Sequence, residues 1–313
     1  MSLCQTLKSE YASLLTLKGE FDLEYQKAVE TGNLDRAKEL KAELEVRMKA
    51  LKEKLHISVE KAAEIMKENF LGPEAIKKTF GFTPEAIPPI PFKQEELKRA
   101  KELNQILILQ VSEDESKNPL TMKSMNEKVR GVATAANKLL YNIDWYKDEL
   151  FFTNESVSSG WKLVSKEVIP ETQKNKNYLE QTEILIDHLK TAVFENHPLP
   201  QEYEDAIAEF ETEKAGIAAI IDSDWKKAGE MLLKLKITTL LKESAPDLLY
   251  RLILEDNSNN QKLLGAIYSW TKSRSSDGHL VSVGGFNAEG AYVDRDVAGY
   301  RYDYLGSVLS RVK

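Results

Sequence analysis

Residues 273–313 read SRSSDGHLVSVGGFNAEGAYVDRDVAGYRYDYLGSVLSRVK, and their composition differs from that of the rest of the chain. The whole protein has 34 lysines and 9 arginines, yet Ser273–Val312 contains four of the arginines and no lysine. Glutamate is nearly absent from this segment, and glutamine, methionine and tryptophan do not occur. Tyrosine is concentrated at positions 292, 300, 302 and 304, among aspartate, arginine and glycine. Such a mixture is typical of recognition surfaces, because tyrosine offers a large rigid contact area and small polar residues form adaptable hydrogen bonds.

An ordinary C-terminal β-sheet is the simpler interpretation of the same composition. β-forming residues replace helix-favouring lysine and glutamate in sheets, which accounts for the tyrosines and valines. This interpretation accounts less well for the clusters at 294–296 and 300–304, because aspartate is depleted in strands. Composition alone leaves both interpretations open.

Several short motifs follow one another towards the C-terminus. They are Trp270, Ser273-Arg274-Ser275, Asp277-Gly278, Val281-x-Val283-Gly284-x-Phe286, Gly290-Ala291 and Leu305-Gly306-Ser307-Val308-x-Ser310-Arg311. In this order they resemble the end of a C-type-lectin-like domain of the formylglycine-generating-enzyme type. The segment Gly160–Ser165 resembles the strand that precedes the helices of this fold. The resemblance implies an α+β domain, here with a longer helical insertion than a compact lectin-like domain needs.

The C-terminal segment is also similar to the variable proteins of diversity-generating retroelements. In that family adenine-directed mutagenesis randomises codons near the C-terminus, often AAY codons. Mutation of AAY at its adenines cannot yield Lys, Glu, Gln, Met or Trp, and readily yields Tyr, Asp, Asn, Ser, Gly and Arg. The composition of residues 273–313 has the same bias. The resemblance therefore implies a non-catalytic scaffold that displays a hypervariable surface to a protein or other macromolecular ligand.

The resemblance places the ligand-binding variable surface at eleven positions between 279 and 304. They are His279, Asn287, Tyr292, Asp294, Arg295, Asp296, Tyr300, Arg301, Tyr302, Asp303 and Tyr304. Leu280, Phe286, Leu305 and Val308 are expected to be buried beneath them, so that the exposed positions can change while the sheet stays fixed. Affinity would then come from a few tyrosine and arginine anchors.

Composition limits the other classes of function. A formal net charge of −7 argues against nucleic acid and anionic membranes as main partners. Cys4 is the only cysteine and the four histidines are dispersed, so we expect no disulfide framework, no metal and no cofactor. No apolar run approaches the length of a membrane span, and the N-terminal residues lack the apolar core of a signal peptide. A cytoplasmic location is the default expectation, which leaves unconventional export open.

The chain is expected to have three parts. Residues 1–70 form a helical hairpin or short coiled coil, because apolar residues recur at intervals of three and four around a break at 31–33. These helices could form a homo-oligomer, and a partner-binding groove is the less favoured alternative. Residues 71–92 contain five prolines and are predicted to be a semi-rigid linker that lies against the following domain. Residues 93–313 form the C-type-lectin-like domain.

The pattern within this domain predicts alternating helices and strands. Helices are expected at 94–103, 121–140, 176–194, 200–219, 222–241 and 246–255, and strands at 106–111, 141–145, 150–152 and 161–165.

Sequence motifs of catalysis are absent. Val283–Phe286 lacks the Lys-Ser/Thr of a phosphate-binding loop, and the chain has neither a GxSxG nor an HExxH sequence. Formylglycine-generating enzymes need an active-site cysteine pair, which residues 93–313 do not contain. A structural or assembly protein with an invariant C-terminal interface is the alternative function, and an enzyme of unrecognised type ranks behind it.

Overall fold

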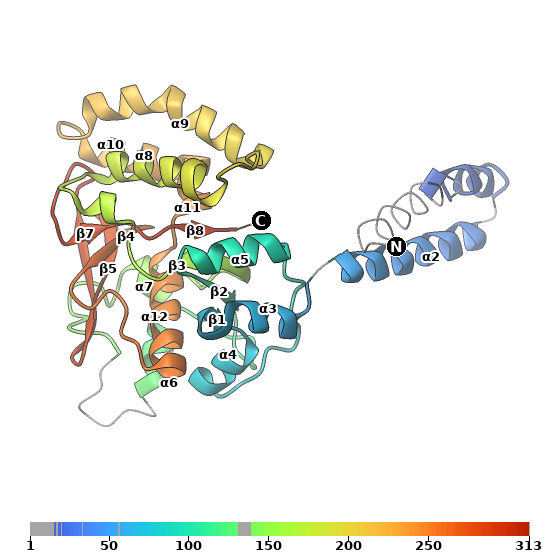
Figure 1. Cartoon of the computed structure of the whole chain (residues 1–313), viewed down its shortest axis with the longest axis horizontal. Coiled ribbons are helices and arrows are strands. Elements are labelled where there is room, and N and C mark those ends of the chain that lie inside the picture. The colour runs from blue at the N-terminus through green and yellow to red at the C-terminus, as the bar shows by residue number, and fades with distance from the viewer. Residues whose placement is uncertain are drawn as a thin grey trace. The chain divides into compact units, whose positions relative to one another are not determined.

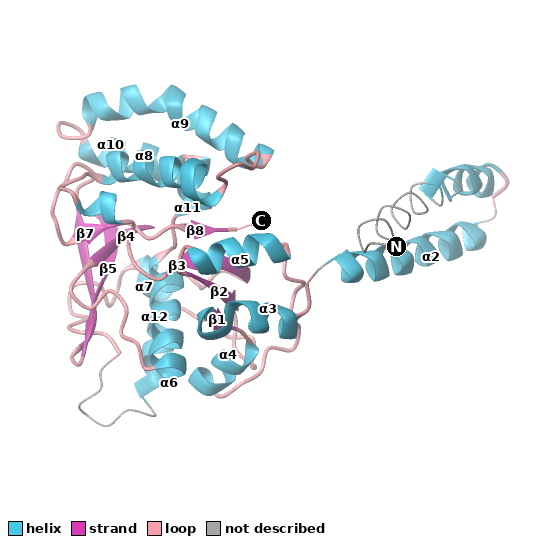
Figure 2. Cartoon of the chain, viewed as in Figure 1, coloured by secondary structure: helices cyan, strands magenta, loops and turns pink. Residues whose placement is uncertain are grey.

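The computed structural model describes residues 16, 18–19, 21–32, 34–55, 57–130 and 139–312. The helical pattern of residues 1–15 and the middle of the helix predicted at 121–140 lie outside these ranges. Helices and two sheets occur together, which confirms the α+β class (Figure 2). The chain divides into two compact units, one of residues 1–61 with 89–94 and the other of residues 62–88 with 95–313.

The first unit contains a helical hairpin in its described part. Residues 21–30 are helical, Thr31 and Gly32 turn the chain, and α2 runs over Leu34–Leu55. The Thr31 hydroxyl donates to the Lys27 carbonyl at 2.8 Å, which satisfies the end of the first helix. An ion pair between Arg36 and Glu24, 3.8 Å apart, links the two helices across the turn.

The second unit contains two four-stranded sheets and most of the helices (Figure 1). The helices are α3 (Val59–Met66, which begins in the first unit), α4 (Pro73–Phe80), α5 (Gln94–Glu102), α6 (Met122–Arg130), α7 (Leu150–Thr153), α8 (Tyr178–His188), α9 (Gln201–Ile220), α10 (Trp225–Lys234), α11 (Lys236–Leu241) and α12 (Ala245–Asn259). Single turns of 3₁₀ or π-helix cover Lys67–Asn69, Pro170–Gln173 and Leu189–Val193.

The first sheet has the order β1-β2-β3-β8. Its strands are β1 (Phe70–Leu71), β2 (Gln105–Gln110), β3 (Gly160–Ser165) and β8 (Ser310–Arg311). β2 is parallel to β1 and antiparallel to β3, and β8 is antiparallel to β3, with Leu163 opposite Arg311. Every residue of β2 is buried, which explains why its sequence QILILQ is apolar almost throughout. β3, the strand that precedes α8, is thus paired with β8 near the end of the chain.

The second sheet has the order β6-β5-β4-β7. Its strands are β4 (Tyr268–Arg274), β5 (Leu280–Asn287), β6 (Gly290–Asp296) and β7 (Leu305–Gly306). β4, β5 and β6 form an antiparallel meander, and β7 returns parallel to β4. Helices α8–α11 pack against one end of this sheet, where Trp270 and Leu280 join their apolar core.

Helix α12 lies between the two sheets and contacts both of them (Figure 1). Its first eleven residues, 245–255, are all buried, although Asp247, Arg251 and Glu255 are among them. These three charges recur every fourth residue and therefore follow one face of the helix. Each has a buried or nearly buried partner of opposite charge: Lys162 lies 2.8 Å from Asp247, Glu243 lies 3.0 Å from Arg251, and Lys166 lies 2.9 Å from Glu255.

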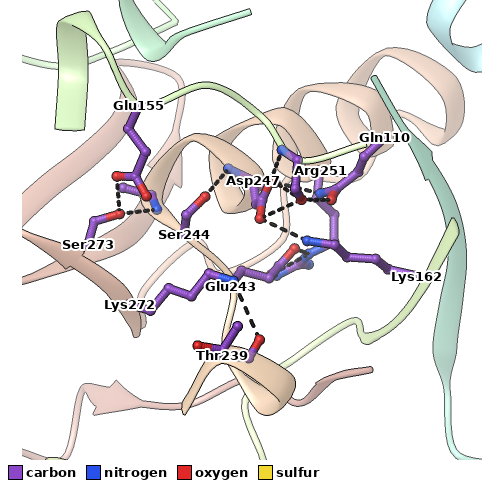
Figure 3. Close-up of polar contacts among 12 residues, drawn as sticks. Gln110, Glu155, Lys162, Thr239, Glu243, Ser244, Asp247, Arg251, Lys272 and Ser273 are labelled. Atoms are coloured by element: carbon purple, nitrogen blue, oxygen red, sulfur yellow. Dashed lines mark hydrogen bonds and ion pairs between the residues drawn. The ribbon is translucent and has the colours of Figure 1, made fainter. Parts of the chain in front are cut away.

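Additional hydrogen bonds complete the surroundings of Asp247 (Figure 3). Its carboxylate accepts from the Ser158 backbone amide at 2.8 Å and from the Ser158 hydroxyl at 2.9 Å. Burial alone would raise the pKa of Asp247, but the Lys162 charge and these hydrogen bonds outweigh burial and lower the pKa. Ser244 caps the helix by accepting from the Asp247 amide. Asp247 therefore fixes the start of α12 against β3.

Several predicted elements differ from the structure. The strands predicted at 141–145 and 150–152 are wrong, because residues 144–148 form turns and Leu150–Thr153 is helix α7. Here Tyr146, Phe151 and Phe152 bury their rings against one another without a regular period. The helix predicted at 222–241 is two helices, α10 and α11, because Leu235 between them has extended backbone dihedrals.

The predicted linker at 71–92 contains helix α4, which packs on α12. Pro73 occupies the first turn of α4, where a missing amide proton costs nothing, and Gly81 ends the helix in the left-handed conformation. Residues 71–88 belong to the second compact unit, whereas residues 89–94 belong to the first.

Replacing Lys162 by methionine is expected to destabilise the protein by about 3–5 kcal/mol, because it leaves the Asp247 carboxylate buried without its cation. Urea unfolding at neutral pH measures this change. Lys98→Met removes a charge from the exposed side of α5 and should change stability by no more than about 0.5 kcal/mol. Equal unfolding midpoints for the two variants would show that the buried pair is dispensable.

Candidate ligand-binding surface

The hairpin of β5 and β6 places the predicted residues by strand alternation. In β6, Ala291 and Val293 are buried, whereas Tyr292 is partly exposed and Asp294 is exposed. The turn between the strands is held by the Asn287 side chain, which accepts from the Glu289 amide at 2.7 Å. Gly290 follows with a φ of +114°, which a residue with a side chain rarely adopts.

None of the eleven predicted positions is buried. Asn287, Asp294, Arg301, Tyr302, Asp303 and Tyr304 are exposed, and His279, Tyr292, Arg295, Asp296 and Tyr300 are partly exposed. By contrast, the four residues expected beneath them, Leu280, Phe286, Leu305 and Val308, are each at most 3% exposed. The sequence analysis therefore predicted correctly which of these positions are at least partly exposed and which are buried.

Five tyrosines form a row on the second sheet and the adjoining loop. Tyr300 stacks on Tyr302 with ring centroids 5.2 Å apart, and Tyr302 lies 4.5 Å from Tyr304. Tyr304 then meets Tyr268 of β4 at 5.9 Å, edge to face. Tyr268 and Tyr292 flank Gly285, since a Cβ built there would lie 3.2 Å from an atom of each. Gly285 has a φ of +55°, so this position both bends the strand and leaves room for the two rings.

Tyr141 extends the row beyond Tyr292, with ring centroids 4.3 Å apart. The sequence analysis did not include Tyr141 or Tyr268 in the site. Tyr268 stands two residues before Trp270 on β4, a strand whose inner residues are buried. Its position at the start of this strand was the signal that could have included it in the site. Tyr141 is brought to the surface by its backbone amide, which donates to the Ala291 carbonyl at 2.9 Å, and no sequence pattern indicates this contact.

Two carboxylates lie beside the tyrosine row. Asp294 and Asp296 alternate with Val293 and Arg295 on β6 and so lie on the same face as Tyr292. Burial and the neighbouring Asp294 charge raise the pKa of Asp296 to about 7. Burial, Asp294 and the neighbouring tyrosines raise the pKa of Tyr268 to about 12. These effects place Asp294 close to both Asp296 and the rings.

His279 and Arg295 lie on the opposite face of the sheet. The Arg295 guanidinium contacts the Asp277 carboxylate at 2.7 Å and stacks over the Trp145 ring at 4.8 Å. The His279 ring nitrogen Nδ1 also lies 2.9 Å from Asp277. Burial would raise the pKa of Asp277, but hydrogen bonds from Ser275 and His279 outweigh burial and lower the pKa. The eleven predicted residues thus do not form one continuous patch.

Arg301 and Asp303 belong to the loop that carries the tyrosines, but each has a separate structural contact. Arg301 donates to the Glu180 carboxylate at 3.2 Å and to the Gly299 carbonyl at 2.9 Å. The backbone carbonyl of Asp303 accepts from the Gln173 side chain at 3.3 Å. These bonds tie the loop to α8 and to the turn before it, so its backbone is held while its side chains face solvent.

The interior also contains a serine–lysine pair. The Lys242 ammonium donates to the Ser307 hydroxyl at 2.7 Å, and that hydroxyl donates to Gln181 at 2.7 Å. Burial lowers the pKa of Lys242 to about 7, which would suit a general base. Both side chains are at most 1% exposed, so a substrate has no access to the hydroxyl in this conformation. We assign the pair to the support of β7 beneath the tyrosine loop.

The described ranges contain neither a cluster of metal ligands nor a membrane-spanning helix. Nowhere in residues 57–130 and 139–312, or in the described helices before them, do three His, Cys, Asp or Glu side chains gather as metal ligands. No helix within the same residues combines the length and the apolar character needed to cross a bilayer.

Comparisons of the chain with protein-family models, with curated proteins and with solved structures found no match. Assignment of function therefore depends on the geometry of the tyrosine row and the residues around it.

The contribution of Asp296 to the stability of the wild-type protein is expected to fall as pH rises from about 4 to 7. In this window the Asp296 carboxyl is protonated in the folded state and ionised in the unfolded state, because its pKa is raised from 3.8 to about 7. Folding therefore takes up a proton at pH values between these two pKa values. Above about pH 7 the contribution of Asp296 to stability no longer changes with pH. Asp296→Asn should weaken this dependence, as measured by urea unfolding at a series of pH values.

Asp303→Asn is the matched control for this experiment, since Asp303 is an exposed aspartate of the adjoining loop. It should retain the wild-type dependence on pH. Identical pH profiles for Asp296→Asn and the wild type would contradict the assignment of the raised pKa to Asp296.

Proposed function

We propose that the protein is a non-catalytic binding protein that recognises a macromolecular ligand through the tyrosine row and its neighbours, on a C-type-lectin-like scaffold. The observation that carries this proposal is that, within residues 279–308, the positions expected to vary are accessible to solvent and the positions expected to form the core are buried. All eleven residues expected to vary are at least partly exposed, whereas Leu280, Phe286, Leu305 and Val308 are buried. A surface built in this way can change its side chains without changing its core.

The position of the segment in the fold supports the same function. Residues 279–304 are followed by β7 and β8, which pair with β4 and β3 respectively. Both ends of the segment are therefore held by sheets. The motif Gly160–Ser165, which resembles the strand before the helices of a C-type-lectin-like domain, is β3, the strand that receives the C-terminal β8.

The composition of the row also supports recognition. Tyr302 and Tyr304 are 47% and 39% exposed, so each ring offers contact area to solvent. The rings are already stacked on one another, which limits the side-chain entropy that binding would cost. Preorganised aromatic side chains of this type are typical anchors of binding surfaces.

The two kinds of position are expected to respond differently to mutation. Tyr302→Ser removes an exposed ring and should shift the melting temperature by no more than about 3 °C. Phe286→Asp introduces a carboxylate at a position that is 3% exposed and should abolish cooperative unfolding of the second unit. Thermal denaturation followed by circular dichroism measures both. Similar destabilisation by the two variants would mean that Tyr302 belongs to the core.

Natural variants that differ only within residues 279–304 provide the test of function. We expect them to bind different partners, or one partner with affinities that differ by more than about tenfold, in a pull-down followed by interferometry. A gene neighbourhood with a second, near-identical copy of the 3′ end beside a reverse transcriptase would accompany such variation. Equal binding of one partner by every variant would instead identify the segment as an invariant assembly interface.

A further inference from the structure

Carboxylates lie near the tyrosine row. Asp294 and Asp296 follow Tyr292 on the same face of β6, and Glu289 accepts a hydrogen bond from the Tyr292 hydroxyl at 2.6 Å. In the described part of the chain, the Asp296 carboxylate has no hydrogen bond and no ion pair. The nearest arginines in the sequence are engaged elsewhere, Arg295 with Asp277 on the other face and Arg301 with Glu180.

This arrangement is unfavourable for the protein alone and favourable for a cation. Two carboxylates two residues apart on one strand face repel one another, and the strand spacing keeps them close. A cationic group placed between them would be attracted by both charges. The faces of the neighbouring tyrosines would add a cation–π interaction, which is strongest where the cation is partly removed from water.

The shape of the surface favours a polypeptide over a small ion. The row continues from Tyr300 through Tyr304 and Tyr268 to Tyr292 and Tyr141, well beyond the two carboxylates. A single small cation would contact only its centre. A protein segment could place its backbone and apolar groups along the rings and a basic side chain beside the carboxylates. Arginine suits this position, because its planar guanidinium can stack on a ring and pair with carboxylates at the same time.

We propose that the partner of this sequence is a protein segment that presents an arginine or lysine side chain to Asp294 and Asp296, between the rings of the tyrosine row. This inference rests on the proposed recognition function and specifies the chemistry of its ligand. The net charge of −7 acts in the same direction, because it attracts basic partners and repels acidic ones.

Selection of binders from a random peptide library displayed on phage tests the proposal on the full chain. We expect arginine and lysine to be enriched among peptides that bind the wild-type protein. The double variant Asp294→Asn, Asp296→Asn should bind the selected peptides at least tenfold more weakly, while melting at a temperature no lower than that of the wild type. Should the double variant fail to fold, Asp294→Asn alone provides the same test, because this side chain is exposed.

A second double variant controls for the loss of charge. Asp187→Asn, Asp205→Asn removes two exposed aspartates from α8 and α9 and should bind the selected peptides like the wild type. An equal loss in both double variants would overturn the proposal, since only net charge would then matter. So would selected peptides that lack a basic residue.

The two proposals fail in distinguishable ways. Peptides without basic residues whose binding is lost in Tyr302→Ser would overturn the basic ligand and leave the recognition surface intact. Peptides whose binding is unaffected by both Tyr302→Ser and the Asp294, Asp296 double variant would overturn the surface as well.

Discussion

Helix α12 is held by three buried ion pairs on one of its faces, and the rest of the second unit depends on them. The partner of Asp247 lies on β3, and the partner of Glu255 lies just after β3. The partner of Arg251 lies just before the helix. Removing six charged groups from water is costly, and only well-oriented partners offset that cost. An apolar helix of this length could rotate or slide between two sheets. The charged face permits one rotation and one register, which is the specificity that such pairs can provide.

A fixed α12 supports the second sheet from one side. The helix contacts β4 and β5, whose inner residues are buried, and the core beneath the loop at 297–304 is continued by Leu305, Val308 and Leu309. Stability is thus concentrated in side chains that point inward. The exposed tyrosines of the loop contact one another, through stacked rings and a hydrogen bond between the hydroxyls of Tyr300 and Tyr304. Substitution at these positions removes few interactions on which the fold depends.

The sequence predicted the regular, continuous elements of the fold well. β2, β3, α5, α9 and α12 lie within a few residues of the expected ranges, because each has a clear period or an unbroken apolar run. Residues 141–145 and 150–152 were wrongly predicted as strands, since a dense aromatic sequence indicates burial without specifying backbone conformation. The partners of the α12 charges could not be predicted, because Lys162 and Asp247 are separated by 85 positions.

The candidate site shows the same limit. Exposure of the eleven residues was predicted correctly, but their grouping was not. Alternation along β6 places Arg295 on the face opposite Tyr292, Asp294 and Asp296. Tyr141 and Tyr268 join the row through contacts made only in the folded chain. Composition therefore indicated the chemistry of the surface, whereas its arrangement required the register of the strands.

The pairing of β8 with β3 has a consequence for a gene whose 3′ end is altered. β7 and β8 are synthesised after residues 279–304, and until β8 is added β3 pairs with β2 alone. A frameshift or stop codon anywhere in the altered region would remove β8 from the first sheet and expose apolar core residues to water. Such truncated products would be removed by cellular proteases, so that each copy that persists has been read through in frame.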